Sequence, residues 1–313
     1  MHLQTSASWL AAAPSALHEI FAQGRPLMVG YLRQIFASPA FTLATQQPGT
    51  AGQAARTGLE FGLGKGLALS ASGQAFVWPY LLGGPPLVSG TAPGVWVVCL
   101  FAAAVGLAVA LRSEWAGLWS RGRGATQGAG QEWLPLLVAA VPCVLVQWRL
   151  GALATRYHTA ASVGVFLLLS GAVLRLAEGW LRRNPPSAPS VPPWLALCAG
   201  ALAGFGALPG LSTVAILLAA VLYGRVSVVG AGRFALMAAT IVMVLEGLIH
   251  FRSALLLWPA HALPLAAAAA VGAAAGGWLL LVLLRVGQRA LPVMASYCTA
   301  TAALLLLFGV FAR

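Results

Sequence analysis

Long apolar stretches alternate with short polar ones along most of this chain. Leu263–Val286 and Val293–Phe311 are almost continuously apolar, and about 20 apolar residues are enough to cross a bilayer as a helix. Because a transmembrane β-strand alternates apolar and polar residues, the pattern excludes an outer-membrane barrel. It predicts an all-α polytopic membrane protein with spans at about Gly94–Leu111, Trp133–Leu150, Thr159–Leu176, Phe234–His250, Leu263–Leu284 and Val293–Phe311.

Two further stretches are long enough to span a membrane but are rich in glycine, hydroxyl-bearing residues and proline. The first, Leu59–Leu82, is predicted as a helix–loop–helix hairpin with its tip near Ser70–Gln74. The second, Trp194–Tyr223, has the same layout. Irregular backbone at membrane depth is tolerated only where protein or a polar cavity surrounds it. Both stretches are therefore predicted as re-entrant hairpins rather than lipid-facing helices.

Each hairpin is followed by three spans, so the chain reads as one unit repeated, at about 58–178 and 193–313. An odd number of spans between the hairpins inverts the second copy. Inverted repeats place a binding site where their broken elements meet near the midplane, so the tips Ser70–Gln74 and Pro209–Thr213 are predicted to form one site. Residues 1–57 are less apolar and are predicted as an interfacial and linker extension of the membrane domain at 58–313.

The composition agrees with a membrane location, since 60% of the residues are hydrophobic and 8% are charged. The net charge of +12 comes from basic residues spread singly or in small groups between apolar runs. A nucleic-acid binder would gather these charges on one face, so no nucleic-acid partner is predicted. Basic loops at Arg112–Arg123 and Arg175–Arg183 are separated by two spans. They are predicted on one side, as candidates for the cytoplasmic side.

Few residues suit acid–base or metal chemistry. There is no Asp, and Glu246 with His250 forms an i,i+4 pair inside a predicted span. A carboxylate within a membrane is a functional candidate; a neutral, hydrogen-bonded Glu246 is the alternative. The cysteines each lie alone in an apolar run and are predicted as inert buried thiols, without disulfides or a metal site: Cys99, Cys143, Cys198 and Cys298.

The hairpin tips carry groups suited to an anion. Gly-rich, hydroxyl-bearing loops between half-helices expose backbone N–H groups at positive helix ends, which attract phosphate or carboxylate. Lys65 lies about one helical turn before Ser70 and would add a cation; a lysine that only reaches to the interface is the alternative. The candidate phosphate-binding residues are Lys65, Ser72, Gly73, Gln74, Gly210 and Thr213, and the candidate catalytic residues are Ser70 and Ser212.

The first tip aligns without gaps to the motif of a known family. The run Phe61-Gly-Leu-Gly-Lys65-Gly-Leu-Ala-Leu-Ser70-Ala-Ser-Gly-Gln74 resembles E-G-x-T-E-F-L-P-V-S-S-T-G-H of the bacterial undecaprenyl-diphosphate phosphatase family. Leu208-Pro-Gly-Leu-Ser-Thr213 resembles the start of that family's second motif, P-G-x-S-R-S-G. The resemblance covers about residues 59–312 and implies inverted repeats in the bacterial inner membrane, with both motifs in one cavity.

The resemblance also implies a lipid ligand. Members of this family remove a phosphate from the C55 isoprenoid diphosphate carrier of peptidoglycan synthesis, and this activity alters the response to bacitracin. The partners expected by resemblance are a polyprenyl (di)phosphate lipid, the membrane and a second copy of the chain in a homodimer. A divalent metal, Mg or Ca, would be the cofactor that the family implies.

The departures from the motifs fall on the family's catalytic residues. The two motif glutamates correspond to Phe61 and Lys65, the histidine to Gln74 and the arginine to Thr213. Carboxylate ligands for a metal are therefore missing, and each such loss typically lowers a rate by on the order of 10²-fold or more. Three hypotheses follow: a phosphatase with a changed mechanism, a non-catalytic polyprenyl-phosphate binding protein or translocase, and a membrane scaffold whose site has decayed.

Overall fold

The computed structural model describes residues 93–124, 130–188, 190–256 and 290–311, together with the single positions Ser70, Gly73, Val77, Ala270, Val271 and Ala274. All of them belong to one compact unit, Ala54–Arg313. The regular elements in these ranges are helices, apart from one isolated bridge between Ala188 and Val226. The all-helical class predicted from the sequence is confirmed for this part of the chain.

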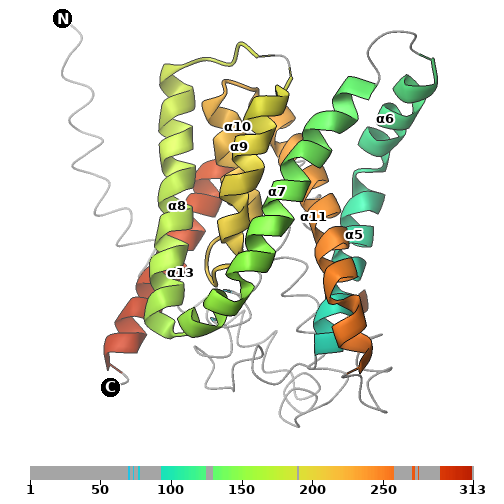
Figure 1. The fold of residues 1–313 in the computed structure, drawn as a ribbon. Helices are drawn as coiled ribbons and strands as arrows, with labels where there is room; N and C mark the ends of the chain where they lie inside the picture. Colours follow the sequence, from blue (N-terminus) through green and yellow to red (C-terminus); the bar gives the residue numbers. More distant parts are fainter. Residues whose placement is uncertain are drawn as a thin grey trace, which may run out of the picture. The chain divides into compact units, whose positions relative to one another are not determined.

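The described elements, in chain order, are α5 (Pro93–Ala110), α6 (Arg112–Gly124), α7 (Gly130–Ala154), η2 (Thr155–Tyr157), α8 (Ala160–Arg183), α9 (Pro193–Ala203), η3 (Gly204–Ala207), α10 (Thr213–Tyr223), α11 (Val228–Leu256) and α13 (Ala290–Phe311) (Figure 1). Of these, α7, α8 and α11 are long and apolar enough to cross a membrane, and α5 with α6 would form a fourth, bent span. Five of the six predicted spans coincide with helices. The span at Leu263–Leu284 lies largely outside the described residues.

The stretch from α9 to α10 is a hairpin that does not cross the bundle. Its two α-helices have 11 residues each, about 17 Å and so about half of the hydrocarbon thickness. At the far ends of the hairpin, the Tyr223 ring lies 5.8 Å from the Trp180 ring of α8. Arg225, two residues after α10, donates to the carbonyl of Pro185, in the segment that leads from the end of α8 to α9. The chain therefore enters and leaves at one end, as predicted for Trp194–Tyr223.

The first predicted hairpin, Leu59–Leu82, lies outside the described residues except for Ser70, Gly73 and Val77. These three are buried. Val77 packs in a small apolar cluster with Val163 and Leu167 of α8. Val77 therefore lies against the first third of α8.

The expected loop at Arg112–Arg123 is wrong, because this segment forms α6. The helix departs from the direction of α5 by 74°. Its residues Trp115 and Trp119 pack their rings 5.7 and 5.9 Å from Trp133 at the start of α7. The charged residues of this segment indicate a loop between two helices, but its tryptophans give it an apolar side that packs on Trp133 and supports a helix.

The prediction of a loop at Arg175–Arg183 is also wrong, because α8 continues to Arg183. Glu178 forms ion pairs with Arg175 at 3.3 Å and with Arg182 at 2.7 Å. Pairs spaced three or four residues apart lie on one helix face and stabilise it. The arginines therefore extend the helix beyond its apolar part instead of ending it.

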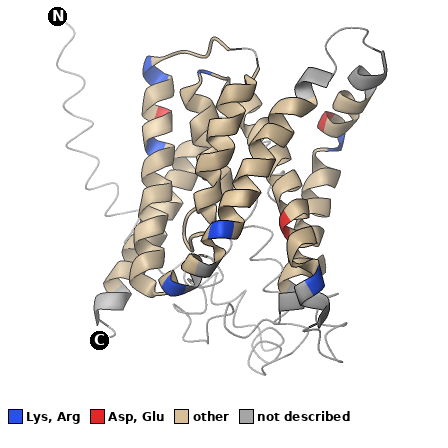
Figure 2. Cartoon of the chain, viewed as in Figure 1, with Lys and Arg blue, Asp and Glu red and all other residues tan. Residues whose placement is uncertain are grey.

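The two basic segments lie at the same end of the bundle, as predicted (Figure 2). Glu114 of α6 forms an ion pair with Arg233 near the start of α11, at 3.2 Å. The start of α11 follows α10 directly, and the end of α10 contacts the end of α8 through Tyr223. The cytoplasmic placement of this end stays a prediction.

The predicted burial of the cysteines is correct at three positions and wrong at one. Cys99, Cys143 and Cys298 are buried, whereas Cys198 is exposed on α9. The apolar run around Cys198 concealed which face of the helix meets the bundle, because both faces of a membrane helix are apolar.

Small residues let α9 approach α7 closely. A Cβ atom at Gly200 would lie 2.0 Å from the carbonyl oxygen of Ala139 in α7. A Cβ atom at Gly204 would lie 2.4 Å from Cβ of Val146, which lies about two turns after Ala139 in α7. Such close backbone contact through glycine is a common way for membrane helices to associate, and here it fixes the position of the hairpin.

We expect Gly200→Ala to lower the free energy of unfolding by about 1–3 kcal/mol, because the new methyl group must push α9 away from α7. The matched control is Gly232→Ala in α11, where a Cβ atom meets nothing within 4 Å. That change should leave stability unchanged or raise it slightly, since alanine favours helix. Thermal unfolding of the detergent-solubilised protein, followed by tryptophan fluorescence, measures both. Equal midpoints for the two variants would contradict the packing described.

Candidate functional site

Two buried serines hold the turn of the α9–α10 hairpin. The Ser170 hydroxyl of α8 donates to the carbonyl of Gly210 at 3.1 Å and accepts from the N–H of Ser212 at 3.2 Å. The Ser70 hydroxyl accepts from the N–H of Gly210 at 3.0 Å and from that of Gly73 at 3.2 Å. Backbone groups that no helix satisfies at this turn thus find partners inside the protein, as membrane depth requires.

Ser170 also shows how deep the turn lies. It is 10 residues from Ala160 and 13 from Arg183 along α8, or about 15 and 20 Å from the two ends of that helix. The turn at Gly210 and Ser212 therefore reaches the middle of a helix that is long enough to span. The hairpin ends there, half-way through the bundle.

Glycine is required where the two predicted tips meet. Gly210 has φ +106°, a conformation that L side chains rarely adopt, and its Cβ would lie 2.6 Å from the carbonyl oxygen of Val163. A Cβ at Gly73 would lie 3.0 Å from Cα of Gly210. The structure thus brings Ser70 and Gly73 of the first tip against Gly210 of the second.

Helix α10 begins at this turn and its N-terminus faces a cavity. Ser212 is the N-cap, and its hydroxyl accepts from the N–H of Ala215 at 3.2 Å. Ser212, Thr213 and Val214 line a cavity of about 70 Å³, as does Ser70. That volume has room for roughly five water molecules.

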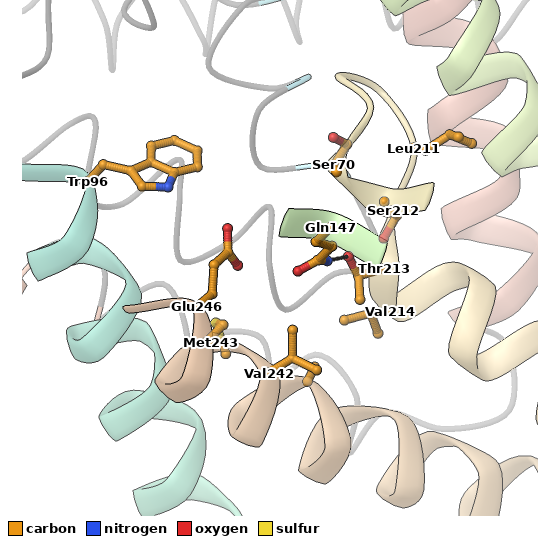
Figure 3. Close-up of a pocket in the computed structure, with 13 residues that line it drawn as sticks. Ser70, Trp96, Gln147, Leu211, Ser212, Thr213, Val214, Val242, Met243 and Glu246 are labelled. Carbon is orange, nitrogen blue, oxygen red and sulfur yellow. Dashed lines mark hydrogen bonds between the residues drawn. The ribbon is translucent and has the colours of Figure 1, made fainter. Parts of the chain in front are cut away.

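Gln147 of α7 forms part of the cavity wall and keeps one polar end without a partner. Its Nε2 donates to the Thr213 hydroxyl at 3.1 Å. Its Oε1 is buried and has no hydrogen-bond partner among the residues that the structure describes, and the whole residue is 7% exposed. The carboxamide is thus held at one end by the first residue of α10 (Figure 3). A buried acceptor without a donor is costly, so this oxygen marks a place where a ligand or water binds.

Glu246 of α11 and Trp96 of α5 line the same cavity. In Figure 3 the Glu246 carboxylate and the Gln147 carboxamide point into the space between their helices. Trp96 is half-buried at this cavity. Apolar residues of α11, among them Val242 and Met243, complete this side. The cavity therefore lies between the N-terminus of α10 and the polar groups of Gln147 and Glu246.

The predicted site residues fall into three groups in the structure. Ser70, Ser212 and Thr213 line the cavity. Gly73 and Gly210 lie behind it, in the contact between the tips. Lys65, Ser72 and Gln74 lie outside the described residues.

Two residues of the site were missed by the sequence reasoning, Gln147 and Ser170. Both are polar residues within the predicted spans, Gln147 in Trp133–Leu150 and Ser170 in Thr159–Leu176. Polar side chains inside spans usually face the protein interior or a cavity, and that signal could have identified them. Their partners, Thr213 and Gly210, are distant in sequence and could not be found from it.

No protein-family model and no curated protein matches this sequence. The function of the chain must therefore be argued from the cavity and the two motifs.

The cavity residues do not form a ligand set for the divalent metal that the family resemblance implies. Among the described residues, no three of the His, Cys, Asp and Glu side chains come together as metal ligands. Mg²⁺ and Ca²⁺ sites are built chiefly from carboxylate and other oxygen ligands, and Glu246 is the carboxylate that the described wall offers. We therefore derive no step through a metal ion.

We expect Ser170→Ala to destabilise the protein by about 2–4 kcal/mol, because it leaves the Gly210 carbonyl and the Ser212 N–H buried without partners. Ser170→Cys, with a weak donor of similar size, should fall between wild type and alanine. Ser113→Ala on the exposed surface of α6 is the control and should be neutral. Chemical or thermal unfolding measures the series, and an alanine variant as stable as wild type would contradict the role of this hydroxyl.

Proposed function

We propose that this protein binds the phosphate group of a polyprenyl phosphate lipid in the cavity at the N-terminus of α10, without hydrolysing it. The observation that carries the proposal is the N-terminus of α10 at a cavity inside the helix bundle, a cavity that the buried, partly unpartnered Gln147 side chain marks as a place for a ligand. Membrane helices around the cavity make a lipid the ligand with the easiest access.

The N-terminus of α10 has the physical properties of a phosphate site. The first N–H groups of a helix have no intrahelical acceptor, and the aligned peptide dipoles place partial positive charge there. In α10 the Ser212 hydroxyl accepts from the N–H of Ala215, and Ser170 accepts from the N–H of Ser212, while Thr213 and Val214 between them line the cavity. Phosphate oxygens are suitable acceptors for N–H groups arranged in this way.

The serine hydroxyls support binding over hydrolysis. The Ser70 oxygen accepts hydrogen bonds from two backbone N–H groups, which use both of its lone pairs. The Ser212 oxygen accepts from Ala215 as a helix cap. A serine acts as a nucleophile when a neighbouring base activates it, whereas these two oxygens are occupied in holding the backbone.

The two motifs supply the class of lipid in this proposal. Ser70, Gly73, Pro209, Gly210 and Ser212 are shared with the undecaprenyl-diphosphate phosphatase motifs, whereas the catalytic glutamates, histidine and arginine of that family are replaced by Phe61, Lys65, Gln74 and Thr213. A chain that keeps the tip contact and lacks the catalytic groups fits a carrier or presenter of a polyprenyl phosphate. We propose that it works in a bacterial inner membrane, with inverted repeats around the site.

A charge reversal at the helix end tests the phosphate site. Thr213→Asp places a negative charge at the first residue of α10, where aspartate suits the helix itself, and should weaken binding of farnesyl phosphate by at least about tenfold through repulsion. Thr213→Asn has nearly the same shape without charge and should stay within about threefold of wild type. Binding of radiolabelled farnesyl phosphate to the detergent-solubilised protein is the measurement. Equal affinities for the two variants would contradict the proposed site.

Hydrolysis is tested separately, with undecaprenyl diphosphate as substrate and with Mg²⁺ or Ca²⁺ added or left out. We expect no phosphate release above that of Ser212→Ala and Lys65→Ala variants. Release by the wild-type protein that both substitutions abolish would establish the alternative, a phosphatase with a rebuilt site. It would also contradict the non-catalytic part of the proposal while leaving lipid binding in place.

A further inference from the structure

The cavity at α10 has two chemically different walls. One wall is the N-terminus of α10, with N–H donors and partial positive charge. The other carries the Gln147 oxygen, buried and without a donor, and the Glu246 carboxylate, with the indole of Trp96 beside them. The Gln147 oxygen has no donor among the described residues, so a ligand suits the cavity best if it brings acceptors to the α10 end and a donor to Gln147.

A phosphate group alone satisfies only the first wall. Its oxygens are acceptors, so they offer nothing to the Gln147 oxygen, and their charge has the same sign as that of an ionised Glu246. Like charges that share one cavity repel each other. The second wall instead suits a hydrogen-bond donor with positive charge, because carboxylate and carboxamide oxygens accept from ammonium groups and an indole attracts a cation through its ring.

We infer that the phosphate bound by this protein carries an amine-bearing substituent, so that the headgroup is zwitterionic. This inference rests on the proposed function and extends it. The phosphate lies at Ser212, Thr213 and Val214, and the ammonium group lies between Glu246 and the Oε1 atom of Gln147. Gln147 links the two parts of the site. Its Nε2 donates to Thr213 at the phosphate end, and its Oε1 would accept from the ammonium group.

The experiment compares two phosphodiesters that differ only in the terminal group of the short substituent. Farnesyl phosphoethanolamine carries an aminoethyl group, and farnesyl propyl phosphate has a methyl group in place of the ammonium. We expect the amine to bind about tenfold or more tightly to the wild-type protein, the effect of one hydrogen bond to a charged group. Isothermal titration calorimetry of the full chain in detergent measures both affinities.

The variants locate the preference at the second wall. Glu246→Gln and Gln147→Met should each bring the ratio of the two affinities to within about threefold, and Glu114→Gln, at the ion pair with Arg233, should leave it unchanged. Because the ratio compares two ligands on the same sample, partial unfolding lowers both affinities and does not imitate the effect. A wild-type protein that binds the propyl compound equally well would overturn the inference, as would a ratio that neither variant changes.

Two more ligands separate this inference from the function on which it rests. Binding of farnesyl phosphate but of neither phosphodiester would overturn the zwitterionic headgroup and leave the proposed function standing. Dihexanoyl-phosphatidylethanolamine carries the same headgroup on a glycerolipid. If it binds and the farnesyl compounds do not, the headgroup is supported and the isoprenoid part of the proposed function is wrong.

Discussion

The need to satisfy backbone polar groups inside a membrane governs this structure. A chain that turns half-way through the bundle exposes carbonyl and N–H groups where no water replaces lost partners. Here the hydroxyls of Ser170 and Ser70 meet that need at Gly210 and Ser212. The same turn starts α10 beside the cavity, so the solution to a folding problem also creates the polar surface on which a ligand can bind.

The architecture could be predicted from the sequence because apolar length and glycine content are local properties. Helices at five of the six predicted spans, three of them long and apolar enough to cross a membrane and a fourth as a bent pair with α6, and the second hairpin follow from these properties. Segment ends were less predictable, since α6 and the last turns of α8 depend on Trp133 and on the ion pairs of Glu178. Charge along the sequence indicates contact with water, but it does not distinguish a loop from a helix whose arginines reach the surface.

Only part of the cavity could be predicted. Motif resemblance identified Ser70, Ser212 and Thr213, and an isolated carboxylate identified Glu246. Gln147 escaped because its importance comes from a hydrogen bond to Thr213, 66 positions away, and from an oxygen left without one. Whether a buried polar atom has a hydrogen-bond partner depends on the packed structure. The Gln147 oxygen is such an atom, and it adds an acceptor to a cavity that also borders the N-terminus of α10.

The α9–α10 hairpin has a consequence for how the chain is oriented. Because it returns to the end where it started, α8 finishes and α11 begins on the same side of the bundle. A hydropathy count that scores Trp194–Tyr223 as one crossing would reverse the assigned side of every residue from α11 onward. Fusion reporters placed after Arg183 and after Arg225 should therefore face the same compartment, and sidedness in the second half must be counted without this segment.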